Sequence, residues 1–314
     1  MRDRTFHLER VGERAFEFEI MIYGDELTDR QPLLITNSIE FPMPPSQAFC
    51  EQMWDAGLQV IFVRRPGHGR SSPLPKPLLT KLNVESGATV MAEAVMLRTL
   101  IVKLGLNNIV LMAMGSSNPT CFRLVHMVSE FSKVILVNPS FNQDIIPVFR
   151  PYWFQKMLKQ IITSQSGLRV AEAGMKMLLR NDPLSFYQTI LKTSPGDLAY
   201  VEANASDYEA AGALELQITG GMLFYDAVMC LTEDRILKDG YFAGVNASVL
   251  IGRDSSDTWK RNMLKETERL NLPLHYAVRA DIFSAFASPE AVIALIRGED
   301  SPYLVPLTEF AVTA

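Results

Sequence analysis

Cysteine and histidine are scarce in this chain, and the few that occur are not spaced as metal ligands are. Among 314 residues there are three cysteines, Cys50, Cys121 and Cys230, which lie far apart. Isolated cysteines argue against a disulfide framework and fit a reducing compartment. The four histidines include no pair with metal-ligand spacing. We therefore expect a protein without a metal or any other cofactor.

The chain also lacks a long apolar run and an excess of basic residues. No stretch approaches the ~20 uninterrupted apolar residues that span a bilayer, and the charged N-terminus is not followed by the apolar run of a secretory signal. The net charge of −5 argues against a sequence-independent nucleic-acid binder, which needs a basic face. We expect a soluble, cytoplasmic protein with no membrane and no nucleic-acid partner.

What the sequence does contain is an ordinary globular balance of 48% apolar and 21% charged residues, with length enough for a large core. Short apolar runs of strand length alternate with segments of helical periodicity. This alternation predicts an α/β protein with a mostly parallel sheet and helices on both faces. We expect strands at 16–23, 32–36, 58–63, 109–113, 134–137, 248–251 and 272–278, and helices at 46–56, 85–104, 118–128, 257–270 and from 289.

The pattern changes between residues 141 and 240. Helical stripes are punctuated there by Pro151, Pro183 and Pro195, and β-branched runs of the strand type are missing. We expect a core domain formed by 1–140 and 241–314, and a helical lid formed by 141–240. The lid is rich in Met and aromatic residues, which suit contact with an apolar small molecule.

The segment Val63-Arg-Arg-Pro-Gly-His-Gly-Arg-Ser-Ser72 resembles the loop after the fourth strand of α/β-hydrolase-fold proteins. The resemblance also covers the segments 32–38, 108–139, 249–254 and 278–296. It implies the α/β-hydrolase fold, with the helical lid inserted after the sixth strand. In that family the loop histidine, here His68, is a turn residue and not the catalytic base.

Hydrolases of this fold carry their nucleophile on a sharp strand-to-helix turn, G-x-S-x-G. The turn here reads Ala113-Met114-Gly115-Ser116-Ser117, with small residues at both offsets from Gly115. The resemblance thus puts Gly115, which has no side chain, at the nucleophile position. Ser116 lies where the family donates an oxyanion-hole amide. Either Ser116 or Ser117 could instead be a displaced nucleophile, and both could simply cap the next helix.

The base and acid positions depart from the family as well. Counting back from Pro289, the resemblance places Asp281 where the family has its histidine, and no histidine follows Tyr276. Asp254, in the turn after the seventh strand, holds the acid position and is alternatively a turn or capping carboxylate. On the oxyanion side the third strand ends in Asn37-Ser38-Ile39 and not in His-Gly.

The remaining candidate groups do not replace the missing ones. His126 lies inside a helix and His275 inside a strand, and we expect both to be structural. Cys121 lies about two turns into the helix after the elbow, where we expect a small buried apolar residue.

Loss of a nucleophile and its base costs an acyl-transfer enzyme many orders of magnitude in rate. We therefore expect a pseudo-hydrolase that binds a small apolar ligand or a protein partner between core and lid. Two alternatives stay open: an active, esterase-like serine hydrolase with a displaced nucleophile, and a regulatory or scaffold subunit. The residues expected to line the pocket are Asn37, Ser38, Ile39, Gly115, Ser116 and Asp281.

Overall fold

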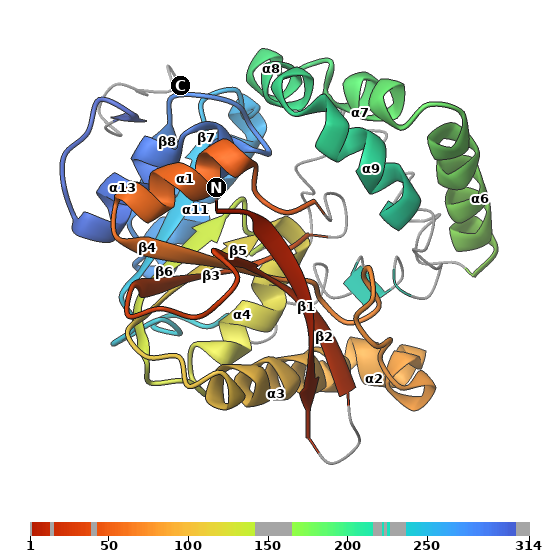
Figure 1. Ribbon diagram of the computed structural model, residues 1–314, viewed down its shortest axis with the longest axis horizontal. Helices are drawn as coiled ribbons and strands as arrows, with labels where there is room; N and C mark the ends of the chain where they lie inside the picture. Colours follow the sequence, from red (N-terminus) through yellow and green to blue (C-terminus); the bar gives the residue numbers. More distant parts are fainter. Residues whose placement is uncertain are drawn as a thin grey trace.

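The computed structural model describes residues 2–12, 16–38, 43–141, 165–215, 222, 225–226 and 237–305. In this part of the chain the strands form one sheet in the order β1-β2-β4-β3-β5-β6-β7-β8-β9 (Figure 1). The strands are β1 (Arg4–Val11), β2 (Phe16–Tyr23), β3 (Gln31–Thr36), β4 (Leu58–Val63), β5 (Ile109–Met114), β6 (Phe131–Val137), β7 (Ala247–Gly252), β8 (Leu274–Ala277) and β9 (Leu304–Val305).

The middle of the sheet is parallel, from β4 through β3, β5, β6 and β7 to β8. The pairs β1–β2, β2–β4 and β8–β9 are antiparallel. Every residue of β4 and β5 is buried, as expected for strands covered on both faces. The predicted class, a mostly parallel sheet with helices on both faces, is confirmed.

Helices fill the connections between the strands. The α-helices are α1 (Gln47–Asp55), α2 (Lys81–Glu85), α3 (Ala88–Lys103), α4 (Asn118–Leu124), α6 (Gln165–Asn181), α7 (Pro183–Leu191), α8 (Pro195–Ala203), α9 (Ala205–Glu215), α11 (Asp257–Leu270), α12 (Ser284–Ala287) and α13 (Pro289–Arg297). Two short 3-10 turns, η1 (Lys76–Leu79) and η2 (Gly115–Ser117), precede α2 and α4.

The helix expected over 85–104 begins three residues later in the structure, as α3 (Ala88–Lys103). Thr80 caps a separate short helix, α2, by accepting a hydrogen bond from the Asn83 amide. Gly87 then adopts a φ of 80°, a left-handed conformation that interrupts a helix, and α3 begins directly after it. The predicted helix is thus confirmed from Ala88 onward, and Glu85, where it was expected to begin, is instead the last residue of α2.

Two apolar clusters lie on the two faces of the sheet. One joins the strands to α3, α4 and α11 through side chains such as Leu97, Phe122 and Trp259. The other joins them to α1 and α13 through side chains such as Phe49 and Val292. The central strands are therefore held between two helical layers.

Helices α6 to α9 follow β6 and precede β7, in the chain segment where a helical lid is expected. They form an arc beside the sheet (Figure 1). Tyr187 and Tyr208 from this arc belong to the cluster that includes α1 and α13, and the Tyr200 ring stacks on Phe283 with centroids 5.1 Å apart. No helix among the described residues is long and apolar enough to cross a membrane. The division into a core domain and a lid stays a prediction.

Candidate functional site

The strand-to-helix turn after β5 keeps the backbone of an elbow but carries no reactive side chain at its centre. β5 ends at Met114, Gly115 adopts a φ of 46°, and η2 leads into α4. A positive φ is strained for any residue with a Cβ, and glycine adopts it freely. The backbone of this turn therefore suits glycine, the residue that the family resemblance places at the nucleophile position.

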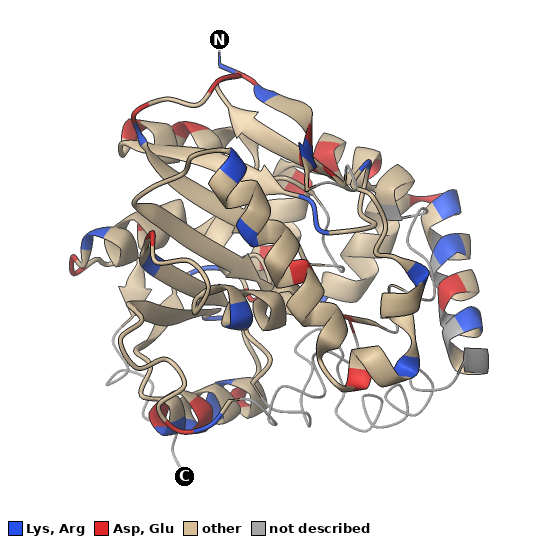
Figure 2. Ribbon diagram, turned by 90° about the horizontal axis from the view of Figure 1, so that it is seen from below, with Lys and Arg blue, Asp and Glu red and all other residues tan. Residues whose placement is uncertain are grey.

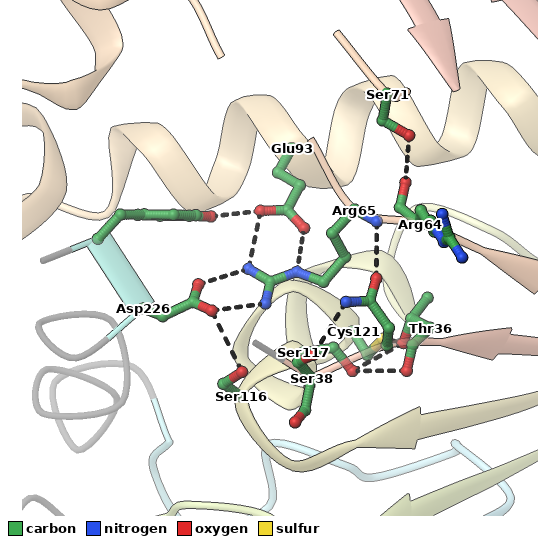
Figure 3. Close-up of polar contacts among 12 residues, drawn as sticks. Thr36, Ser38, Arg64, Arg65, Ser71, Glu93, Ser116, Ser117, Cys121 and Asp226 are labelled. Carbon is green, nitrogen blue, oxygen red and sulfur yellow. Dashed lines mark hydrogen bonds and ion pairs between the residues drawn. The ribbon is translucent and has the colours of Figure 1, made fainter. Parts of the chain in front are cut away.

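Both neighbouring serine hydroxyls are engaged by the protein (Figure 3). The Ser117 Oγ accepts from the Met114 amide at 2.9 Å and lies 2.8 Å from the Thr36 Oγ1, so it fastens the elbow to β3. The Ser116 hydroxyl donates to the Asp226 carboxylate at 3.2 Å. Ser116 is buried as well, with 3% of its surface exposed.

A buried ion-pair cluster lies against Ser116, and sequence reasoning did not anticipate it. Arg65, which follows β4 and is 1% exposed, forms two hydrogen bonds with Glu93 of α3, at 2.7 and 3.2 Å. It forms two more with Asp226, at 3.0 and 2.8 Å. The Tyr225 hydroxyl donates to Glu93 at 2.6 Å. We call Arg65, Glu93, Tyr225 and Asp226 the arginine cluster (Figure 3).

The electrostatics of the arginine cluster keep Arg65 and Glu93 charged. Burial favours the neutral form of Arg65, but the charges of Asp226 and Glu93 outweigh it and raise its pKa well above the ordinary value. Burial likewise opposes ionisation of Glu93, but the charge and hydrogen bonds of Arg65 lower its pKa. Paired charges of this kind are stable only while each partner is present.

The polar residues that follow β3 are hydrogen-bonded within the protein. The Asn37 Oδ1 accepts from the Arg65 amide at 2.8 Å, and its Nδ2 donates to the Ser38 carbonyl at 2.9 Å. Asn37 and Ser38 are both buried. The structure thus brings Asn37, Arg65 and Ser116 together at the ends of β3, β4 and β5, whereas Ile39 lies outside the described residues.

The positions expected to hold the base and the acid serve a different purpose. Asp281 accepts a short hydrogen bond from the Ser255 hydroxyl. Asp254 accepts from the Gly196 amide, at the start of α8, at 3.0 Å. The Asp254 carboxylate thus joins the loop after β7 to α8, and the Asp281 carboxylate joins the loop after β8 to the loop after β7.

Asp197, which sequence reasoning missed as a site residue, completes this contact. It is fully buried, and its carboxylate accepts from the successive amides of Asp281, Ile282 and Phe283 at 2.9 to 3.3 Å. A Cβ at Gly196 would lie 2.4 Å from the Ala280 nitrogen, so α8 and this loop touch. We call Gly196, Asp197, Asp254 and Asp281 the α8 lock. The only sequence signal for it was Ser194-Pro-Gly-Asp197, which predicts a helix start.

The histidines are held in structural positions. Burial, followed by the positive charge of Arg65, lowers the pKa of His68 to about 3, so its ring is neutral. His126 packs edge-on against Tyr241 with ring centroids 4.7 Å apart, and burial lowers the pKa of His275 in β8. Their predicted structural roles agree with these positions.

Cys121 is also as expected, because it is fully buried and burial raises its pKa to about 12. Its Sγ lies 3.6 Å from the Thr36 hydroxyl. A protonated, inaccessible thiol is not a nucleophile. Among the described residues no group of His, Cys, Asp or Glu is placed to hold a metal ion.

Comparisons with known proteins give matches in structure only. No protein-family model and no curated protein sequence matches the chain. A bromoperoxidase from Bacillus anthracis matches with a TM-score of 0.60 and 16% identity, over 93% of this chain and 100% of its own. An esterase from Exiguobacterium antarcticum matches with a TM-score of 0.59 and 14% identity, over 94% of this chain and 100% of its own.

A haloalkane dehalogenase variant from Bradyrhizobium elkanii matches with a TM-score of 0.59 and 15% identity, over 94% of this chain and 97% of its own. A putative α/β hydrolase from Nostoc matches with a TM-score of 0.63 and 14% identity, over 94% of this chain and 97% of its own. Identities this low establish the fold and not the chemistry. Together with the strand order and the elbow after β5, they show that this chain has the α/β-hydrolase fold.

Proposed function

We propose that this protein is a non-catalytic member of the α/β-hydrolase fold that binds a small apolar molecule where the inserted helices meet the sheet. The observation that carries the proposal is the elbow, where Gly115 provides no attacking atom. The loop after β8 provides Asp281 in place of an imidazole, and no histidine follows it. Acyl transfer on this fold needs both groups.

The two candidate replacement hydroxyls are both engaged by neighbouring groups. The Ser117 hydroxyl is committed to the Met114 backbone and to Thr36. The Ser116 hydroxyl donates to Asp226, but both carboxylate oxygens of Asp226 already accept hydrogen bonds from Arg65. A proton moved from Ser116 to Asp226 would therefore disrupt a buried ion pair.

Apolar, adaptable side chains on both sides of the junction support the choice of ligand class. The Met222 sulfur lies over Gly67, 3.0 Å from where a Cβ on that glycine would be. The Tyr187 hydroxyl lies 3.8 Å from the Met43 sulfur. Methionine and aromatic side chains adjust to apolar molecules of different shapes.

Turnover assays test the loss of catalysis. We expect hydrolysis of p-nitrophenyl esters of short and long acids to stay at the level of the denatured protein, and a fluorophosphonate probe to leave the folded chain unlabelled. The control variants are Ser116→Ala and Ser117→Ala. Turnover or labelling that either variant abolishes would contradict the proposal.

Calorimetric titration tests the binding role, with 2-naphthol and 1-octanol as apolar probes. Met222→Glu places a charge beside Gly67 and is expected to weaken binding by at least about tenfold. Met177→Glu, on the exposed side of α6, is the matched control and should leave binding unchanged. Equal binding of a probe to the two variants would contradict this ligand class. So would a failure of both probes to bind the wild-type protein.

One contact favours the alternative of an active serine hydrolase, namely the hydrogen bond between Ser116 and Asp226. In that mechanism Asp226 would accept the Ser116 proton. The fluorophosphonate experiment separates the two cases, because only an activated Ser116 is labelled and the label disappears in Ser116→Ala.

A further inference from the structure

The Asp226 carboxylate is held in the way that an arginine and a hydroxyl hold a free carboxylate. The Nη1 and Nη2 atoms of Arg65 donate to its two oxygens at 3.0 and 2.8 Å. The Ser116 hydroxyl donates to one of the same oxygens at 3.2 Å. Two parallel hydrogen bonds from one guanidinium recognise a planar carboxylate specifically. We call the terminal nitrogens of Arg65 and the Ser116 hydroxyl the carboxylate fork (Figure 3).

Arg65 has another carboxylate partner in Glu93, which belongs to the core. The Glu93 carboxylate accepts from Nε of Arg65 at 2.7 Å and from Nη2 at 3.2 Å. It also accepts from the Tyr225 hydroxyl at 2.6 Å. Glu93 lies in α3, which packs on the sheet. Since Glu93 already provides one carboxylate for the single guanidinium, Asp226 is a second one.

Asp226 comes from a different part of the chain than the groups that hold it. It lies between β6 and β7, 161 positions after Arg65. Arg65 directly follows the loop-side end of β4, and Ser116 lies in the turn after β5. A carboxylate from another molecule can replace that of Asp226 without changing the number of carboxylates around Arg65. Such an exchange avoids the main cost of breaking a buried ion pair, which is a charge left without its partner.

The carboxylate fork is buried and adjoins an apolar side chain of the inserted segment. Arg65, Ser116 and Asp226 are all buried, so water competes little with their charge-assisted hydrogen bonds. Gly67 follows Arg65 by two residues, and the Met222 sulfur lies 3.0 Å from where a Cβ on Gly67 would be. Polar donors beside a methionine fit a molecule with an apolar body and one carboxylate.

We propose that the carboxylate fork binds the acid group of a ligand, and that Asp226 occupies the fork in the unliganded protein as an internal substitute. This inference rests on the proposed function and narrows its ligand from an apolar molecule to an apolar monocarboxylic acid. The carboxylate of the ligand displaces that of Asp226 and accepts the same three hydrogen bonds. Ligand binding thereby also breaks the contact between Ser116 and the inserted segment.

Calorimetric titration with 2-naphthoate and 2-naphthol tests this competition, because the two probes share an aromatic body and differ in the polar group. Asp226→Ala removes the competing carboxylate. We expect it to bind 2-naphthoate at least about tenfold more tightly than the wild type does, with unchanged affinity for 2-naphthol. Glu17→Ala, which removes the exposed ion pair with Arg10, is the matched control and should change neither affinity.

Formate tests the carboxylate fork without the apolar part of the ligand. Asp226→Ala should unfold at a lower temperature than the wild type, because Arg65 loses one of its two carboxylate partners. We expect about 100 mM formate to restore at least about half of this loss, since it binds only the folded variant. Sodium chloride at equal ionic strength is the control for screening, and Glu17→Ala should not respond to formate. Circular dichroism follows the unfolding and checks that each variant is folded.

Hydrogen exchange in the wild-type protein tests the displacement without any substitution. We expect the amides of Tyr225 and Asp226 to exchange faster when the protein is saturated with 2-naphthoate, because the acid removes Asp226 from the fork. The same amides should be unaffected by 2-naphthol. A permanent ion pair between Arg65 and Asp226 would give equal exchange with both probes.

Three results would overturn the proposal. They are equal affinity of 2-naphthoate for the wild type and Asp226→Ala, formate that stabilises Asp226→Ala no more than sodium chloride does, and equal exchange at Tyr225 and Asp226 with both probes. None of them decides the proposed function, because 2-naphthol carries no carboxylate and its binding to the wild type tests the apolar site alone.

Discussion

At the scale of single residues, the most consequential side chain is Arg65. Its guanidinium is held by Glu93 of α3 and by Asp226 of the segment before β7, and all three charged side chains are buried. Because the cluster holds one cation and two carboxylates, removal of the cation leaves Glu93 and Asp226 buried without their arginine partner. The cluster thereby ties the elbow to the 141–240 segment through the Ser116–Asp226 hydrogen bond.

We predict that Arg65→Met lowers the free energy of unfolding by about 3–5 kcal/mol, since it breaks a buried pair by removing one partner. Urea denaturation followed by circular dichroism measures this change. The control is Arg10→Met, whose ion pair with Glu17 is 72% exposed on the arginine side and should cost less than about 1 kcal/mol. Equal effects of the two substitutions would contradict the assigned importance of the cluster.

His68 gives a prediction on pH. Its pKa is lowered from 6.5 to about 3 in the folded protein, mainly by burial, so only the unfolded chain takes up this proton between those values. The stability that neutral His68 contributes is therefore complete above pH 6.5 and is lost as the pH falls. Between pH 6.5 and about pH 4, the contribution of His68 to the free energy of unfolding falls by about 3 kcal/mol.

The measurement is the free energy of unfolding of the wild type and of His68→Asn between pH 7 and about pH 4. We expect the wild type to lose more stability than the variant over this interval. Comparison of the two isolates His68, because all other titrating groups are shared. Parallel curves would show that His68 is protonated or exposed in the folded state.

At the scale of secondary-structure elements, the start of α8 packs against the loops after β7 and β8, which carry Asp254 and Asp281. The Asp197 carboxylate caps three successive amides of the loop after β8, and Gly196 allows the backbones to touch. The Asp254 carboxylate and the Asp281 backbone amide thus fasten an inserted helix. The same loop supplies Phe283, which stacks on Tyr200 of α8.

We predict that Gly196→Ala weakens the α8 lock, because its Cβ would lie 2.4 Å from the Ala280 nitrogen and 2.8 Å from Asp254. Overlap of this kind costs about 1–3 kcal/mol. Hydrogen exchange at the amides of 281–283 should become faster. Gly174→Ala in α6 is the control, since its Cβ meets nothing within 4 Å and helix propensity makes it stabilising by up to about 1 kcal/mol. Unchanged exchange in Gly196→Ala would argue against the lock.

The elements also show where sequence patterns succeed. All seven predicted strands formed, and the run at 58–63 matches β4 residue for residue, because β-branched residues buried on both faces have no competing helical pattern. β1 and β9 were missed. β1 is an edge strand rich in Arg, His and Glu, and its conformation depends on pairing with β2.

At the scale of the whole molecule, Cys50 and Cys121 lie in the two apolar clusters on opposite faces of the sheet. Cys50 packs in the cluster with α1, and Cys121 packs in the cluster with α4. Burial raises the pKa of each thiol to about 12. Both are therefore protonated and inaccessible in the folded protein.

We predict that neither thiol reacts with a disulfide reagent in native Cys230→Ser protein. With rising urea both should become reactive together, and at the midpoint of the circular dichroism transition, because the two layers share the central strands. The measurement is thiol labelling followed by mass spectrometry. Reaction of one thiol before the other would show that the layers unfold separately.

The sequence by itself determined the class of the protein and the identity of the group at the elbow. The turn at Gly115 directly follows the apolar run of β5 (Ile109–Met114), so its place can be read from the order of the residues, and a residue type cannot be altered by folding. Absence of histidine after Tyr276 was likewise readable directly. These features are local, so periodicity and spacing reveal them.

Only the tertiary structure decided what surrounds the elbow. Arg65 and Asp226 are 161 positions apart, and Asp197 and Asp281 are 84 apart, yet each pair shares hydrogen bonds. Charged residues in a sequence usually predict exposed positions, because burial of an isolated charge is costly. Here the cost of burial is offset by partners that the fold brings together from distant parts of the chain. No local sequence pattern predicts such pairs.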